Sequence, residues 1–243
     1  MTKTFKTLMA AGAVALLLGH QALAADPKPL IVVELFTSQG CSSCPPADAL
    51  LGELAARDDI LALSFHVDYW DYIGWKDPFA LPANTSRQRD YARFLGRQYI
   101  YTPQMVVQGA SDTTGAQPSE VAHRLQTAGT MKRLAVALAP EADRLVVGLP
   151  QAAADEEMAV YLIGFDRSRE TSIKRGENSG RTIRYHHVVR EFTRIGSWKG
   201  EAEELRVPLP EAIASGGGCA VLVQSPKSGR IHGAGMIRPA GSS

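Results

Sequence analysis

The stretch FTSQGCSSCPPAD, residues 36–48, decides how this sequence is interpreted. It contains Cys41 and Cys44, two of the three cysteines in a chain of 243 residues. The apolar run LIVVELF at 30–36 precedes the pair and predicts a strand, and PADALLGELAARDD at 46–59 follows it and predicts a helix. The pair therefore lies between a strand and a helix, where unpaired helix N–H groups stabilise a thiolate and lower its pKa.

The spacing of the two cysteines suits thiol–disulfide exchange. Cys41 is predicted to attack a substrate disulfide, and Cys44 to resolve the mixed disulfide that forms. Pro45 and Pro46 disfavour helical geometry in the residue before each of them, so the helix is expected to begin at Pro46. Cys41 then lies further from the helix dipole, and the pKa of its thiol is expected to be only partly lowered.

Strand and helix signals alternate through the rest of the first half. Strands are predicted at 60–67, 104–109 and 112–115, and helices at 84–99 and 118–129. A strand, a helix and a further strand predict a parallel βαβ unit, and the closing hairpin and helix complete an α/β domain of roughly 100 residues. The cysteine pair is placed at the carboxyl edge of the sheet, where open α/β sheets carry their sites.

The second half is dominated by short, turn-bounded strand signals. They lie at 133–140, 144–150, 158–166, 202–210, 219–225 and 230–239. Six such runs with little helix predict a smaller β-rich, sandwich-like domain. We therefore expect a leader at 1–24, an α/β domain at 25–130 and a β-rich domain at 131–243.

The first 24 residues have the pattern of a secretory signal peptide, with an uncleaved anchor as the alternative. Lys3 and Lys6 precede an apolar run of about a dozen residues, which is too short to span a bilayer, and cleavage is expected after Ala24. Export to the periplasm or the extracellular space would let disulfides persist. Cleavage leaves 24 basic against 25 acidic residues, so no attraction to nucleic acid is expected, and no later segment predicts a membrane span.

The order of the predicted elements and the position of the cysteine pair resemble the thioredoxin fold. Thr102 and Pro103 stand directly before the predicted strand at 104–109, which strengthens the resemblance. The resemblance implies that Pro103 is a cis proline facing the cysteine pair, and that the backbone at Thr102 and Pro103 binds substrate.

Five longer motifs are spread over nearly all of the chain after residue 24: VVELFTSQGCSSCPPAD (32–48), SFHVDYWDYIGWKDPF (64–79), RQRDYA (87–92), YTPQMVVQG (101–109) and RGENSGR (175–181). Through these motifs the sequence is more closely similar to the domain-of-unknown-function 1223 family, DUF1223. This similarity implies a thioredoxin-like fold with an appended β-rich part. It implies no activity, because the family has no settled one.

Several further residues are candidates for the site, each with an alternative. Glu34, inside the first strand, could take a proton from Cys44, or it could be hydrated or paired with an arginine. The aromatic residues Tyr69, Trp70 and Trp75 could form a wall for an apolar peptide, or pack against the second half. The polar loop at 175–181 could bind an acidic group, or dock the two halves together.

Three function classes remain open. The first is a thiol–disulfide oxidoreductase that acts on thiols or disulfides of exported proteins and exchanges electrons with a redox partner protein. The second is a non-catalytic binding module in which Cys41 and Cys44 form a structural disulfide. The third is a copper carrier that uses both cysteines and His66, although a lone histidine is also an ordinary structural residue. Cys219 is expected to be a buried free thiol. The sequence contains no nucleotide-binding or serine-hydrolase motif, and no cofactor is expected.

Overall fold

The computed structural model describes residues 27–238. The predicted signal peptide and its cleavage site lie outside this range. Within the described residues, no helix is both long enough and apolar enough to cross a membrane.

The first half forms alternating strands and helices. In chain order they are β1 (Ile31–Thr37), α1 (Pro45–Ala55), β2 (Ile60–His66), the 3₁₀ helix η1 (Asp71–Ile73), α2 (Pro82–Phe94), β3 (Gln104–Val107), β4 (Ser111–Thr113) and α3 (Pro118–Gly129). Strands β1 and β2 are parallel, and β3 pairs antiparallel with the other edge of β1. The predicted βαβ unit is therefore present, and α1 begins at Pro45 with Cys44 as its N-cap, one residue before the predicted start.

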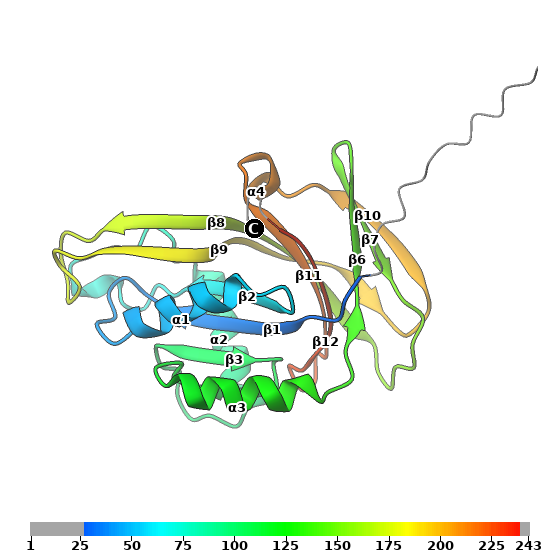
Figure 1. Cartoon of the computed structure of the whole chain (residues 1–243), viewed down its shortest axis with the longest axis horizontal. Helices are drawn as coiled ribbons and strands as arrows, with labels where there is room; N and C mark the ends of the chain where they lie inside the picture. Colours follow the sequence, from blue (N-terminus) through cyan, green and yellow to red (C-terminus); the bar gives the residue numbers. More distant parts are fainter. Residues whose placement is uncertain (1–26, 239–243) are drawn as a thin grey trace, which may run out of the picture.

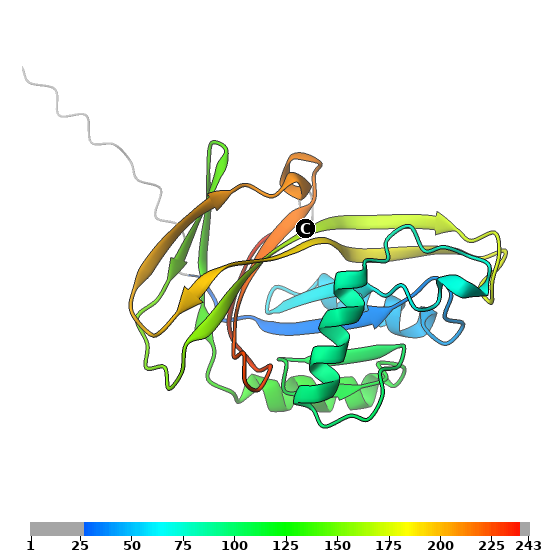
Figure 2. The same cartoon turned by 180° about the vertical axis from the view of Figure 1, so that it is seen from behind.

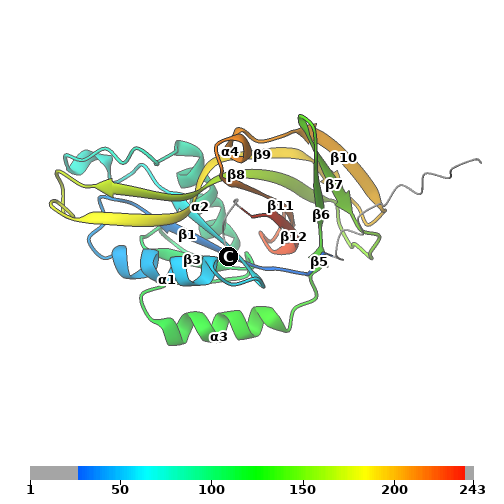
Figure 3. The same ribbon diagram turned by 45° about the horizontal axis from the view of Figure 1, so that its top comes forward.

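Helices cover both faces of this part of the sheet, which explains why β1 and β2 read as continuous apolar runs. All seven residues of each strand are buried. Val33 and Leu35 pack with α1 and α3, whereas Val32 and Phe36 face the other way and pack with Tyr91 of α2. Figure 2 shows α2 crossing the face of the sheet that is turned away from α1 in Figure 1, and Figure 3 shows α1 and α3 on one side and α2 on the other.

The second half contributes more strands. They are β5 (Leu134–Ala135), β6 (Ala137–Glu141), β7 (Arg144–Leu149), β8 (Met158–Ser172), β9 (Thr182–Trp198), β10 (Glu203–Pro208), β11 (Gly218–Gln224) and β12 (Ile231–Ile237), with a short helix α4 (Glu211–Ala214). Ser64 of β2 pairs in parallel with Val188 of β9, so one curled sheet continues from the first half into the second, in the order β4-β3-β1-β2-β9-β8-β11-β12-β5. Strands β10, β7 and β6 form a separate small sheet. The protein is thus a mixed α/β structure, and the division of the chain at residue 130 stays a prediction.

Strands β8 and β9 form the longest hairpin in the described chain. Their pairing runs from Met158 opposite Trp198 to Ser172 opposite Thr182, with bulges that increase the local twist. The outer part of the hairpin extends past β11, and its tip, residues 173–181, reaches the end of β1 and the start of α1 (Figure 1). This hairpin brings the polar loop of the second half to the cysteine pair of the first.

Candidate functional site

Cys41 and Cys44 form a disulfide at the carboxyl end of β1. Their Cα atoms are 5.4 Å apart, and the Cys44 N–H donates to the Cys41 carbonyl at 3.2 Å, which closes a tight turn. Two N–H groups of the first turn of α1, those of Ala47 and Asp48, donate in turn to the Cys44 carbonyl at 2.9 and 3.1 Å. The pair is thus built onto the amino end of α1, but its side chains are covered: Cys41 is 1% exposed and Cys44 is 0% exposed.

Thr102 and Pro103 lie at the same end of the sheet. Phe36 pairs with Gln104, so Pro103 is the residue beside Thr37, the last residue of β1. The Thr102–Pro103 peptide bond is cis, as the sequence resemblance implies. The indole N–H of Trp70 donates to the Thr102 hydroxyl at 2.8 Å, which ties the segment after β2 to this loop.

Trp75 approaches the cysteine loop from the same segment. Its indole N–H donates to the Gln39 side-chain oxygen at 2.8 Å. Tyr69, Trp70 and Trp75 are all half-buried, whereas Tyr72 between them is exposed. The aromatic residues predicted as a substrate wall therefore flank the cysteine loop and the Thr102–Pro103 loop.

The tip of the β8–β9 hairpin is fastened to the cysteine loop. The side-chain amide of Asn178 donates to the carbonyls of Gln39 and Cys41, at 3.0 and 2.9 Å, and the Ser42 N–H donates to the Glu177 carboxylate at 3.2 Å. Gly176 has a φ of 76°, and a side chain at this position would begin 3.3–3.4 Å from Ile73 and Trp75. The loop at 175–181 therefore docks the second half onto the first, which is one of the two roles predicted for it.

Glu34 lies on the other side of the sheet from α1. Its carboxylate accepts two hydrogen bonds from the Arg87 guanidinium of α2, at 2.8 and 3.0 Å, and a further one from the Tyr91 hydroxyl. Arg87 also donates to the Gln224 side chain of β11 at 3.1 Å. Because Cys44 begins α1 on the opposite face, the structure pairs Glu34 with an arginine and does not bring it to the cysteine pair.

Asp48, in the first turn of α1, is a buried acid that the sequence analysis did not single out. Asp48 follows Cys44 by four residues in α1, a spacing that places two side chains on one face of a helix. It is 3% exposed, and burial raises the pKa of its carboxyl to about 7, against an opposing effect of His66. The available signal was the position of Asp48 in the first turn of the predicted helix.

His66 and Asp77 form a second buried pair beside Asp48. The Nδ1 atom of His66 lies 2.7 Å from the Asp77 carboxylate. Burial opposes the charge of Asp77, but His66 and the N–H groups of Gln39 and Phe79 outweigh burial and lower the pKa of Asp77. Since Gln39 stands two residues before Cys41, this pair is joined directly to the cysteine loop.

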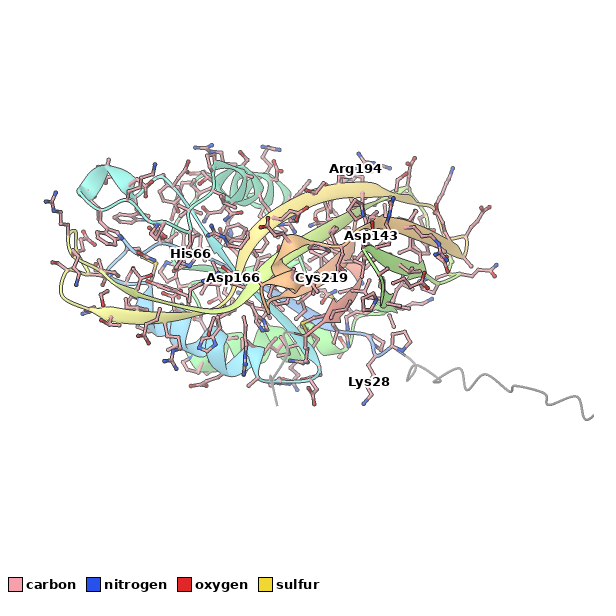
Figure 4. All side chains as sticks on the ribbon, turned by 90° about the horizontal axis from the view of Figure 1, so that it is seen from above. Lys28, His66, Asp143, Asp166, Arg194 and Cys219 are labelled. Carbon is pink, nitrogen blue, oxygen red and sulfur yellow. A yellow bond between two sulfur atoms is a disulfide. The ribbon has the colours of Figure 1, made fainter. Side chains whose placement is uncertain are left out.

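Other expected features lie elsewhere. Cys219 is a free, fully buried thiol, as predicted, and Figure 4 places it toward the small sheet and away from His66. Among the described residues, no three His, Cys, Asp or Glu side chains form a group that could hold a metal ion. A cavity of about 700 Å³ opens beside Tyr101 and Arg124, and neither cysteine of the pair lines it.

The comparison with protein families confirms the resemblance to DUF1223. The family model described as a protein of unknown function, DUF1223, matches residues 32–224. The chain belongs to the DUF1223 family. No curated protein matches it.

Two solved structures are similar to this DUF1223 protein. Protein AGR_C_4864 from Agrobacterium tumefaciens is 34% identical, with a TM-score of 0.76, over 87% of this chain and 95% of that one. HBP35 of Porphyromonas gingivalis is 14% identical, with a TM-score of 0.61, over 89% of this chain and 78% of that one. The second likeness concerns the fold alone.

Proposed function

We propose that this DUF1223 protein is an exported thiol–disulfide exchange protein whose Cys41–Cys44 pair cycles between disulfide and dithiol. The observation that carries the proposal is the position of the disulfide. It lies at the amino end of α1 and the carboxyl end of parallel β1, with Thr102 and Pro103 at the same end of the sheet. This arrangement supports a thioredoxin-like fold for residues 27–130.

The exchange has two balanced steps. A thiolate of a partner protein attacks the Cys41 sulfur, the Cys41–Cys44 bond breaks, and Cys44 leaves with the electron pair. A second partner thiolate then attacks the mixed disulfide and releases Cys41 as a thiolate. Two electrons pass to the pair while the partner gains a disulfide, and the reverse sequence oxidises the pair. Tyr69, Trp70 and Trp75 flank the site and would contact the apolar part of an exported protein substrate.

Burial of the disulfide favours a second candidate, a binding module in which the bond is structural. Both cysteines are covered, and the Asn178 side chain bonds the Cys41 carbonyl. Exchange through Cys41 therefore requires the hairpin tip at 173–181 to move aside. The two candidates differ in whether a protein thiol reaches Cys41 in the native state.

Turnover of a two-cysteine peptide separates the candidates. The peptide carries a fluorophore and a quencher joined by a disulfide, and glutathione regenerates the protein. The exchange reaction predicts turnover by the wild-type protein and none by Cys41→Ser, while Cys219→Ser retains it as the control. Equal background rates for wild type and Cys41→Ser would contradict the proposal and favour the structural disulfide.

A further inference from the structure

A cavity at the end of α1 away from the cysteine pair is not used by the exchange reaction. Its volume is about 470 Å³, which is in the range of small-molecule binding sites. Its walls come from α1, from the β8–β9 hairpin that runs alongside α1 (Figure 1), and from the residue that follows β12. The charged and titratable residues of the lining are Arg167, Arg184, Arg238, His186, His187 and Asp58. Basic groups therefore dominate this cavity, in a chain whose basic and acidic residues are nearly balanced, 26 against 25.

Arg238 closes the cavity at the carboxyl end of α1. Its guanidinium donates to the Ala55 carbonyl at 3.3 Å and to the Arg57 carbonyl at 2.6 Å, which offsets the negative end of the helix dipole. A guanidinium has five N–H donors, so these bonds leave Arg238 further donors for a ligand. Asp58, the acid of the lining, lies 3.3 Å from Arg238, but its side chain is 96% exposed and is screened by water. The end of the helix therefore does not make the cavity negative.

The β8–β9 hairpin supplies a basic wall. Arg184 stands two residues before His186 in β9, and side chains two residues apart share one face of a strand. Arg184 donates to the Glu170 carboxylate at 3.0 Å, but both side chains are more than half exposed. Such a surface ion pair contributes little and rearranges readily. Arg184 can therefore turn toward an anion in the cavity, which Arg167 lines from the neighbouring strand.

The His186 ring is held against the backbone of α1. A Cβ atom at Gly52 would lie 2.8 Å from Cδ2 and 3.1 Å from Nε2 of this ring, so a larger residue would displace it. Glycine inside a helix lowers the stability of the helix, and the close approach of the imidazole explains its presence. Burial lowers the pKa of His186, and the positive charge of Arg184 lowers it further. The ring is therefore neutral at neutral pH.

The backbone at His187 is the second costly feature of this cavity. Its φ is 47°, a left-handed conformation that residues other than glycine rarely adopt. The ring is fixed by a hydrogen bond of 2.8 Å between Nδ1 and the Ala62 carbonyl of β2, and burial lowers the pKa of His187 to about 4. Strained residues cluster at binding sites, where the surrounding structure holds them in place. A helix glycine and a strained strand residue thus meet at one basic cavity, which indicates a binding site.

We propose that this cavity binds the phosphate group of a small molecule. Arg167, Arg184 and Arg238 donate to the phosphate oxygens, and guanidinium groups can do so through two parallel hydrogen bonds each. The three arginines belong to β8, to β9 and to the residue after β12, so they approach the ligand from different directions. This arrangement suits the tetrahedral oxygens of a phosphate better than a flat carboxylate. The volume leaves room for the organic part of a phosphate ester.

A phosphate in the cavity changes the protonation of His186. Its negative charge favours the imidazolium and raises the pKa of His186, against the opposing effects of burial and Arg184. The ring then takes a proton from solvent and becomes a further donor to the phosphate. The other charged groups around the cavity are Arg167, Arg238, Glu170 and Asp58.

Calorimetric titration of the purified protein with inorganic pyrophosphate tests the site. We expect Arg167→Gln and Arg184→Gln to bind pyrophosphate at least about tenfold more weakly than wild type, since each variant loses charge-assisted hydrogen bonds. Both positions are exposed, so neither change disturbs the core. The matched control is Arg194→Gln, which removes the same charge from an exposed position of β9 opposite Tyr161, far along the hairpin from the cavity (Figure 4). Its affinity should stay within about twofold of wild type, because salt screens a distant surface charge.

Two results would overturn the inference. The first is an affinity that is the same in Arg184→Gln and Arg194→Gln, or no binding of pyrophosphate to wild type at millimolar concentration. The second comes from proton NMR titration of the His186 ring in the wild-type protein, with its signals assigned from His186→Gln. A pKa of His186 that does not rise when pyrophosphate is added would show that no anion enters the cavity.

A vesicle experiment identifies the source of the phosphate. Phosphatidylglycerol vesicles that sediment wild type but not Arg184→Gln would assign the site to a lipid headgroup. Vesicles that sediment neither protein, together with pyrophosphate binding, would assign it to a soluble phosphate ester. The inference does not depend on the exchange function, and Cys41→Ser should bind pyrophosphate as wild type does, because Cys41 lies beyond the other end of α1.

Discussion

Asn178→Ala is predicted to speed the opening of the native disulfide. The Asn178 amide makes two of the hydrogen bonds that hold the hairpin tip on the cysteine loop, at 3.0 and 2.9 Å to the carbonyls of Gln39 and Cys41. A buried hydrogen bond contributes about 1 kcal/mol, so losing two lowers the free energy of lifting the tip by about 2 kcal/mol. Since about 1.4 kcal/mol is a factor of ten, reduction should become about 30-fold faster.

The assay is reduction of the oxidised protein by excess dithiothreitol in native buffer, quenched by alkylation and read by mass. Ser179→Ala is the matched control, because the Ser179 hydroxyl donates to the Lys174 carbonyl inside the same loop, at 3.0 Å. Its rate should stay close to that of wild type. An Asn178→Ala rate within about threefold of wild type would refute the reasoning, since the hairpin tip would then not limit access to Cys41.

Three further predictions concern stability and reactivity. Arg87→Met leaves the buried Glu34 carboxylate without its arginine and should lower the free energy of unfolding in urea by about 3–5 kcal/mol. A double variant, Glu34→Leu with Arg87→Met, that recovers none of this loss would contradict the ion-pair account. Asp48→Asn should be more stable than wild type at pH 8 by up to about 4 kcal/mol. Folding raises the pKa of the Asp48 carboxyl to about 7, so the free energy of unfolding of the wild-type protein falls as pH rises from about 4 to 7. A urea midpoint that is the same at pH 5 and pH 8 in both proteins would contradict this prediction. Burial raises the pKa of Cys219 to about 12, so a thiol reagent at pH 8 should count no reactive thiol in the oxidised native protein and one after unfolding.

Local sequence patterns were sufficient to predict the elements of the first half, because helical and strand periodicity depend only on residues that are close in the sequence. Helix α3 spans Pro118–Gly129, as predicted. Helix α2 ends at Phe94 rather than at residue 99, because the chain turns at Gly96, which has a φ of 64°. One glycine in a left-handed conformation is enough to end a helix, and the helical pattern of the surrounding residues does not indicate that it will do so.

The way the two halves join could not be predicted in the same manner. The strand β9 was not among the six predicted strands, since its outer part forms a half-exposed arm with β8 and carries charged residues on its open face. The parallel pairing of Ser64 with Val188 links positions 124 residues apart and leaves no local pattern. The sequence therefore predicted most strands of the second half, but not that they extend the first sheet.

Sequence patterns also could not show which of two acids, Glu34 or Asp48, lies on the side of the sheet that α1 covers. Glu34 stood out because a carboxylate inside an apolar strand is rare, but the pattern does not say which face of a doubly covered strand it occupies. Its neighbours Val33 and Leu35 face α1, so the Glu34 side chain points to the opposite face, where it pairs with Arg87. Asp48 was visible only as an ordinary acid in a first helical turn. Its burial against His66 depends on packing between elements.

The measurement that tests the central claim most directly is a redox titration of Cys41 and Cys44 in the purified protein against glutathione or dithiothreitol, with free thiols counted by alkylation and mass. The exchange function predicts a reversible two-thiol transition between about −120 and −270 mV, the range of working oxidoreductases. A pair that stays oxidised below about −300 mV would be a structural disulfide and would contradict the claim.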